Sequence, residues 1–459
     1  MSAVFRATIT NQKSTIGFHA SLTTQNKSSA LRKASLFYLV FVMFSYTTGG
    51  PFGLEDMVTT SGPGMTLIYL LVLPFFWCIP VSLVSAELTT VMPVEGGFYR
   101  WTRAAFGDFW GFLAGWWNWS ASFLLGGAYA VLFTDYLVYY LPKMTWWEHY
   151  LVSLALIAVL TWINVRGIQM VGQVATALEI FIFVPVMTMI VIALFHWQHN
   201  PFVPWVPPHQ ATFKIFGVGL ALGLWLYSGY EQLSTVAEEV ENPQQAYPRA
   251  LALVVPLSIA AYFLPTLAGL ASAGNWEKWH TGFFSDAARM IGGPWLGTWM
   301  TLAAMVGNVA LLNSTILTTT RMPFAMAEDG YLPEVLTRKH SRYATPWLAI
   351  VMSAGIYALL AWQSLAQLIS VYIWLRSATT VLTVLSAWKL RHTQLELKRS
   401  FTVPGGRAGL LYVVGAPVVM ALVALLGSDR FGMIGGAVAI VVGPAIYWIL
   451  RHKSRVAKT

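Results

Sequence analysis

A hydrophobic segment of this chain is interrupted by residues that are costly inside a membrane. Residues 34–60 are apolar enough to span a bilayer, yet two glycines, a proline and two acidic residues lie within the stretch Gly49–Asp56. Unpaired backbone groups are strongly unfavourable at bilayer depth, so irregular backbone occurs there only where protein or a cavity surrounds it. We therefore predict a discontinuous membrane helix that borders a cavity.

A second interruption of the same kind lies at Trp225–Glu231. Both breaks contain a Gly-x-Glu triplet, at Gly53–Glu55 and at Gly229–Glu231. Paired interruptions at corresponding positions of two halves are the sequence sign of a secondary transporter's binding site. The pattern predicts a carrier.

The composition predicts a polytopic, all-α membrane protein, because 56% of the residues are apolar and only 10% are charged. Apolar runs of about 18 residues or more recur along the chain. We predict twelve transmembrane helices, of which the first and the sixth are discontinuous. Their approximate bounds are 34–60, 64–92, 109–138, 148–165, 170–197, 213–240, 249–273, 295–321, 346–362, 364–389, 408–427 and 432–451.

The domain organisation follows from these segments. We expect residues 1–33 to be a disordered cytosolic tail, because they are polar and have no compact apolar region. Residues 34–391 form the predicted transporter core, with two inverted repeats at about 34–197 and 213–391. Residues 392–459 contain helices 11 and 12 and a basic cytosolic C-terminus.

The net charge of +9 is assigned to membrane topology and not to a nucleic-acid partner. Placing both termini in the cytoplasm puts most of the 28 Lys and Arg residues on the inner side, as the positive-inside rule requires. This predicts a multi-pass protein of the plasma (inner) membrane.

The inverted sense of the two repeats assigns different surroundings to the two breaks. The same Gly-x-Glu offset places Glu55 outward of its break and Glu231 inward of its own. Unwound segments expose amides at one half-helix and carbonyls at the other, which suit an anionic and a cationic group respectively. A zwitterion, or a cation held by added carboxylates, is the expected ligand.

Five motifs of the chain belong together: Gly49–Asp56, Glu95–Tyr99, Val131–Leu137, Ser234–Pro243 and Ala327–Pro333. With them the chain resembles the amino acid–polyamine–organocation superfamily over roughly residues 35–400, closest to its branch of polyamine–proton symporters. The resemblance implies a LeuT-type fold with a 5+5 inverted repeat plus two helices, and proton symport of amino acids or polyamines by alternating access.

The chain departs from that pattern at positions that affect the substrate. Leu125 and Gly126 stand where plant members carry an Asp-Asn pair, and the tenth helix has a cation, Arg376, with hydroxyls near Thr383. These departures favour an amino acid with one carboxylate, whereas two glutamates favour a cation. We expect an amino acid or polyamine with net positive charge. An exchanger, a neutral amino acid permease and a transporter-derived substrate sensor remain the alternatives.

The candidate substrate-binding residues come from the two breaks. Glycines allow close approach of the backbone to a ligand, aromatic rings can enclose a cation, and carboxylates inside a membrane are functional by default. Dipole stabilisation by Glu55 and ordinary aromatic packing are the structural alternatives. The predicted residues are Gly49, Gly50, Phe52, Gly53, Glu55, Trp225, Tyr227, Gly229, Tyr230 and Glu231.

Three further ionisable groups lie within predicted helices. Glu231 and Glu179 are the two candidates for proton coupling, and a polar helix contact is the alternative for Glu179. Arg376 is a possible charge partner of Glu55 or Glu231, with snorkelling to the membrane surface as its alternative. Glu55 is expected to recruit the substrate's ammonium group.

Other functional classes lack their motifs. The sequence contains no phosphate-binding Gly-x-x-x-x-Gly-Lys-Ser/Thr loop, no His-Glu-x-x-His and no Gly-x-Ser-x-Gly. We therefore expect neither an enzyme nor an ATP-driven pump, and no cofactor or metal. The only cysteine, Cys78, lies in the second span, which predicts no disulfide-linked partner subunit. The expected partners are a small-molecule substrate, a proton (with sodium left open) and the lipid bilayer.

Overall fold

The first predicted break is present in the computed structural model, which describes residues 36–92, 97–167, 172–208, 217–230, 242–394, 396 and 399–456. Seven residues, 48–54, separate helix α2 (Leu36–Thr47) from helix α3 (Glu55–Ser61). Gly50 and Gly53 have φ angles of 97° and 89°, which residues with a side chain rarely adopt. The glycines noted in the sequence are therefore what allows the chain to leave one half-helix and enter the next.

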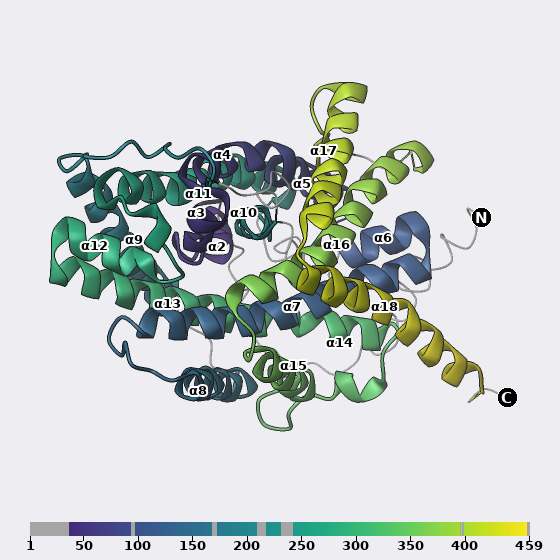
Figure 1. Ribbon diagram of the computed structural model, residues 1–459. Helices are drawn as coiled ribbons and strands as arrows, with labels where there is room; N and C mark the ends of the chain where they lie inside the picture. Colours follow the sequence, from purple (N-terminus) through teal and green to yellow (C-terminus); the bar gives the residue numbers. More distant parts are fainter. Residues whose placement is uncertain are drawn as a thin grey trace, which may run out of the picture. The chain divides into compact units, whose positions relative to one another are not determined.

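The second predicted break follows α10 (Val218–Leu226). Residues 227–230 are irregular, and Gly229 has a φ of 108°. Glu231 lies outside the described residues. Helix α10 packs against α3, so the helix before the second break meets the half-helix after the first. Figure 1 shows α2, α3 and α10 together, with α4, α5 and α11 on one side and α7 and α13 on the other.

The remaining predicted segments coincide with helices to within a few residues. The largest difference at a start is in α11, which begins six residues earlier than expected because Asn242 adopts a left-handed conformation directly before Pro243. The helices are α4 (Pro63–Leu73), α5 (Ile79–Val91), α7 (Asp108–Leu137), α8 (Trp146–Val165), α9 (Gly172–Ala193), α11 (Pro243–Ala273), α13 (Pro294–Thr319), α15 (Trp347–Leu360), α16 (Leu365–Thr393), α17 (Gly406–Gly427) and α18 (Arg430–Val456).

A π-helical turn, Pro74–Cys78, joins α4 to α5. In a π turn each carbonyl bonds to the amide five residues later, and for Phe75 that residue is Pro80, which has no N–H. The Tyr412 hydroxyl of α17 donates a hydrogen bond to the Phe75 carbonyl instead. The prolines thus distort the second predicted span, and the carbonyl that Pro80 leaves without a backbone donor bonds to the eleventh.

Three short helices were not predicted from the apolar runs: α6 (Gly97–Phe106), α12 (Phe283–Gly292) and α14 (Arg321–Glu328). Each mixes apolar with charged residues. In α12 the buried residues Phe283, Phe284, Ala287, Ala288 and Ile291 follow helical spacing, so only one face is covered. A search for continuous apolar runs overlooks such amphipathic helices.

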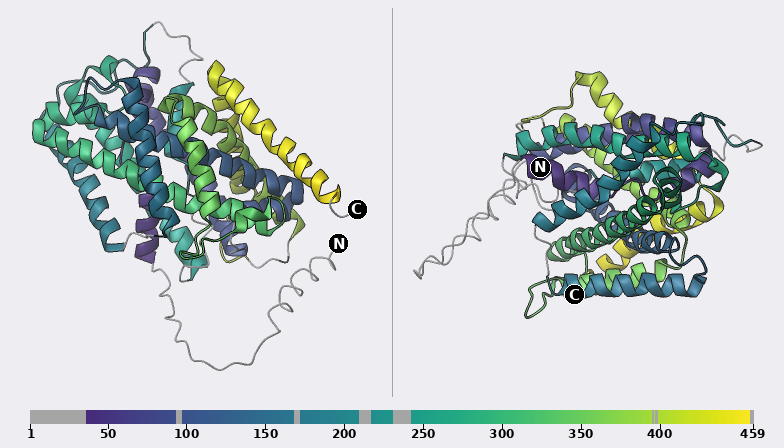
Figure 2. Two further views of the ribbon diagram at one scale, coloured as in Figure 1. Left: turned by 90° about the horizontal axis from the view of Figure 1, so that it is seen from below. Right: turned by 90° about the vertical axis from the view of Figure 1, so that its left-hand side faces the viewer.

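Eight helical stretches of the described residues are long and apolar enough to cross a membrane. Their burial separates centre from periphery: 78% of the most apolar window of α16 is buried, against 17% for α18. Figure 2 shows α18 along the edge of the helices. Peripheral helices expose large apolar side chains such as Leu426, Ile434 and Val441, which suit lipid contact. The chain is an integral, multi-pass membrane protein.

Candidate functional site

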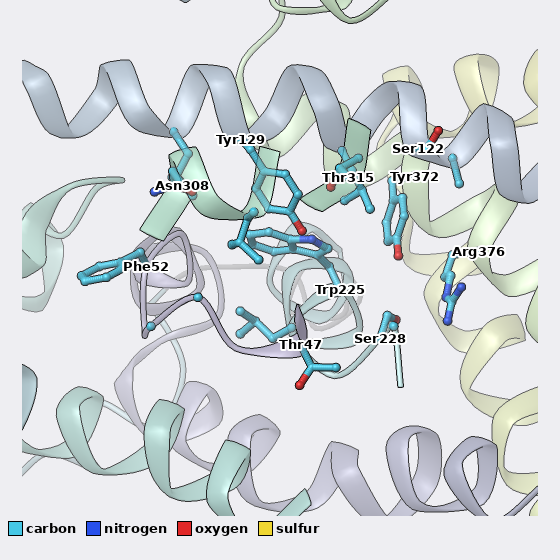
Figure 3. Close-up of a pocket in the computed structure, with 18 of the residues that line it drawn as sticks. Thr47, Phe52, Ser122, Tyr129, Trp225, Ser228, Asn308, Thr315, Tyr372 and Arg376 are labelled. Atoms are coloured by element: carbon cyan, nitrogen blue, oxygen red, sulfur yellow. The ribbon is translucent and has the colours of Figure 1, made fainter. Parts of the chain in front are cut away.

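A cavity of about 60 Å³ lies between the two breaks. Its wall combines residues of both breaks with residues of α7, α11, α13 and α16 (Figure 3). Six of the residues singled out in the sequence line it, namely Gly49, Gly50, Phe52, Trp225, Gly229 and Arg376. Gly53, Glu55, Tyr227 and Tyr230 do not belong to its wall.

Glycines bring the first break close to α13. A Cβ on Gly307 would lie 2.6 Å from the Gly49 carbonyl oxygen, and a Cβ on Gly49 would overlap the Leu311 side chain. Larger residues at either position would force the two segments apart. The break is therefore held against α13 by the absence of side chains, with the Gly49 backbone beside the cavity.

The aromatic part of the wall differs from the predicted cage. Phe52 and Trp225 line the cavity, together with Tyr129 of α7 and Tyr372 of α16. The Tyr129 and Trp225 ring centroids are 6.3 Å apart. The sequence analysis did not predict either tyrosine, although each lies one helical turn from another residue of the cavity wall. Tyr129 lies four residues after Leu125, which also lines the cavity, and Tyr372 lies four residues before Arg376.

Tyr227 and Tyr230 point elsewhere. The Tyr227 hydroxyl donates a hydrogen bond to the Leu70 carbonyl at 2.6 Å. The Tyr230 hydroxyl lies beside Cys78 and Ser258. Both rings are buried in packing between the second break and its neighbours. Periodicity could not assign their direction, because an irregular segment has no fixed repeat.

The Glu55 carboxylate is fully buried beside the cavity and accepts three hydrogen bonds. The Gly53 amide donates to Oε2 at 2.7 Å and the Gly282 amide donates to Oε1 at 3.1 Å. The Tyr136 hydroxyl donates to Oε1 as well. Direct contact between Glu55 and a ligand therefore stays a prediction, while these bonds join α3, the end of α7 and the loop before α12.

The neighbouring Asp56 fastens α3 to the same loop. Its two carboxylate oxygens accept hydrogen bonds from the Thr281 amide at 2.8 Å and the Thr281 hydroxyl at 3.0 Å. Glu55 and Asp56 together form what we call the outer clasp, with Tyr136, Thr281 and Gly282 as its donors. The two acidic residues that interrupt the apolar segment thus serve the attachment of the second half-helix.

Arg376 lies in the cavity wall and is 3% exposed. Figure 3 shows it at one end of the cavity with Ser228 and Tyr372, and Phe52 at the other end. None of the described residues that line the cavity is acidic. Of its two predicted charge partners, Glu55 is bonded within the outer clasp and Glu231 lies outside the described residues. Arg376 brings its guanidinium group to this end of the wall.

Glu179 of α9 lies outside the cavity wall but close to the first break. Its carboxyl group lies beside the hydroxyl of Ser45, two residues before Thr47, which lines the cavity. One carboxyl oxygen has no hydrogen-bond partner among the described residues. The predicted proton carrier thus contacts the half-helix α2 and could respond to its movement.

A second charged network, which we call the inner clasp, joins α5 to the far end of α16. Glu87 accepts hydrogen bonds from Arg391 through both carboxylate oxygens and from the Val403 amide at 2.8 Å, with Arg399 3.6 Å away. Asp56 shares a surface pocket with Leu365, the first residue of α16. That helix has 29 residues, about 43 Å at 1.5 Å per residue, so the two clasps lie at its opposite ends.

A buried cavity, walled by the break between α2 and α3 and by the irregular residues after α10, is typical of a membrane protein of the transporter class. The chain belongs to the amino acid permease family, whose model matches residues 35–449. It is similar to a probable polyamine transporter of Arabidopsis thaliana, 32% identical over 93% of this chain and 85% of the relative. A second polyamine transporter of that plant is 32% identical over 90% and 84%. A polyamine transporter of Oryza sativa subsp. japonica is 32% identical over 93% and 80%.

Proposed function

We propose that this permease is a secondary active transporter of amino acids or polyamines that works by proton symport and alternating access. The observation that carries the proposal is the cavity between two helix breaks, and we infer that the outer and inner clasps close it on its two sides. The amino acid permease family and the names of the relatives support the substrate class. Twelve helices in a LeuT-type inverted repeat, cytoplasmic termini and a plasma-membrane location belong to the same proposal.

The size of the cavity supports a gating cycle. A volume of about 60 Å³ holds only a few water molecules, so a larger substrate requires the breaks or the clasps to move. Opening the outer clasp would admit a substrate from one side, and opening the inner clasp would release it on the other. Irregular backbone at Gly50, Gly53 and Gly229 supplies the hinges for such movement.

A cationic amino acid satisfies the charge features best. Its ammonium groups can donate hydrogen bonds to the carbonyl groups of the breaks. They are also attracted to the carboxylates of Glu55 and Glu231. Its carboxylate suits the end of the cavity that Arg376 lines. A polyamine has no carboxylate to place there. We therefore place a cationic amino acid ahead of a polyamine as the substrate.

The two glutamates of the breaks have unequal proposed roles. Glu55 attracts the substrate's ammonium group from the outer side, and Glu231 exchanges the coupling proton. Glu179 is the competing proton carrier, because its carboxyl group is buried against α2. Carboxyl groups inside the membrane commonly relay protons in transporters.

Uptake by reconstituted protein tests this function. Proteoliposomes with an inward proton gradient should accumulate labelled arginine, lysine or putrescine, and a protonophore should abolish the accumulation. Glu231→Gln should remove gradient-driven accumulation but leave substrate exchange measurable. Glu179→Gln serves as its comparison. Loss of coupling in Glu179→Gln with full coupling in Glu231→Gln would move the proton site to α9, and uptake that ignores proton and sodium gradients would indicate an exchanger.

A further inference from the structure

Asn308 of α13 is a buried polar residue of the cavity wall that the proposed roles leave unused. It is 1% exposed and lines the cavity. Its side-chain Nδ2 donates a hydrogen bond to the Ala304 carbonyl at 2.8 Å. Its Oδ1 accepts no hydrogen bond from the part of the chain that the structure describes. Buried polar atoms in native proteins are nearly always paired, so this oxygen needs an explanation.

The bond to Ala304 fixes which way the amide faces. A carbonyl oxygen can only accept a hydrogen bond, so the Asn308 atom that faces the Ala304 carbonyl must be the nitrogen. Exchanging the amide's nitrogen and oxygen would oppose two acceptors. Oδ1 is therefore the free acceptor, and Asn308 offers a ligand an oxygen rather than a donor.

The surroundings of this oxygen suit a positive group. Gly307, the preceding residue, lies against the Gly49 carbonyl of the first break. Figure 3 shows Asn308 at the same end of the cavity as Phe52, opposite to Arg376. Carbonyl oxygens and an aromatic face attract an ammonium group, which carries three donors and no acceptor. A carboxylate would be repelled by the Asn308 and Gly49 oxygens, which are both acceptors.

We propose that Asn308 Oδ1 accepts a hydrogen bond from the primary ammonium group of the transported substrate. The proposal rests on the proposed transport function, and it adds a residue that determines specificity. Amino acids and polyamines share this group, so the assignment holds for either. For an amino acid it also fixes the orientation, with the carboxylate towards the end that Arg376 lines.

A polar residue on α13 can also serve to join two helices instead of binding a ligand. Asn313 is an example of that role. Its Oδ1 accepts a hydrogen bond from the Asn164 side chain at 2.8 Å. Asn313 therefore joins α13 to α8, whereas Asn308 bonds only within its own helix among the described residues. The pair gives a matched test, because both are asparagines on one helix.

Equilibrium binding to the purified full-length protein separates the two roles. The probes are arginine, alanine and putrescine, each compared with an analogue that carries hydroxyl in place of amino groups. Asn308→Leu should weaken binding of the amines by roughly 10- to 100-fold, the size of a lost hydrogen bond to a charged group, and reduce the preference over the hydroxyl analogues. Asn308→Asp should preserve that preference, because a carboxylate also accepts from ammonium.

Stability provides the second readout. Asn308→Leu removes the unpaired Oδ1 together with the bond from Nδ2 to the Ala304 carbonyl. That carbonyl lies inside α13 and keeps its helical partner, so the unfolding temperature without ligand should stay close to that of the wild type. Asn313→Leu should lower the unfolding temperature, because the Asn164 amide loses one of its two acceptors and the bond between α8 and α13, yet retain amine preference. An Asn308→Leu protein that keeps full amine preference overturns the inference. A wild-type protein that binds neither amino acid nor diamine overturns the proposed function and the inference with it.

Discussion

At the scale of single residues, the carboxylates of the first break show how a costly residue becomes part of the structure. Glu55 and Asp56 interrupt an apolar segment, and all of their described bonds come from donors on neighbouring elements and on the break itself. A buried carboxylate tolerates this position because donors surround it. Attraction of substrate by Glu55 then requires the outer clasp to loosen, which links recruitment to gate opening.

Glu55→Gln tests that link. A glutamine amide offers one oxygen and one NH2 group, so at least one of the three donors at Gly53, Tyr136 and Gly282 would face another donor. We expect a loss of about 1.5–3 kcal/mol in the free energy of unfolding, typical of a hydrogen bond to a charged group, and a higher apparent KM for uptake. Tyr136→Phe removes one donor and should give a smaller loss. Wild-type KM and stability in Glu55→Gln would contradict the role assigned to this residue.

At the scale of helices, much of the architecture could be predicted from the sequence. The breaks at Gly49–Asp56 and after Trp225 follow from residue types that a membrane helix excludes. Helices α6, α12 and α14 could not be predicted in this way, because each buries only one face. The directions of Tyr227 and Tyr230, and the meeting of Asn308 with the first break, depend on packing between distant segments. No local pattern encodes them.

The inner clasp makes a prediction about how α5 and α16 are joined. Glu87 is 2% exposed, and removing one partner of a buried ion pair leaves an unpaired charge. Glu87→Gln should therefore lower the free energy of unfolding by about 3–5 kcal/mol. Arg391→Gln should show the same effect, and the double variant should lose less than the sum of both. Unfolding of detergent-solubilised protein, followed by tryptophan fluorescence, measures each loss.

A second ion pair serves as the control for the inner clasp. Asp108 and Arg103 are 2.9 Å apart, with 60% and 38% of their side chains exposed. Exposed pairs contribute at most about 1 kcal/mol, so Asp108→Asn should have little effect. Equal losses in Glu87→Gln and Asp108→Asn would show that the inner clasp does not hold α5 to α16.

At the scale of the whole molecule, the proposed arrangement is a central cavity whose two sides are closed by the outer clasp and the inner clasp. The outer clasp joins α3 to the loop before α12, and the inner clasp joins α5 to the C-terminal end of α16. Transport requires that the outer and inner clasps never open at the same time, because a continuous path across the membrane would dissipate the proton gradient. The central claim is therefore that the same cavity faces the two sides of the membrane in turn.

Labelling of one cysteine placed in the cavity tests this claim most directly. Ser122 lines the cavity and differs from cysteine by one atom, and Cys78 is the only native thiol. In a Cys78→Ala background, Ser122→Cys should react with a membrane-impermeant thiol reagent added to either side of oriented proteoliposomes. Bound substrate should slow both reactions, and mutational weakening of the outer clasp should favour labelling from the outside. Reaction from one side only, whatever the substrate or the clasp variant, would contradict alternating access through this cavity.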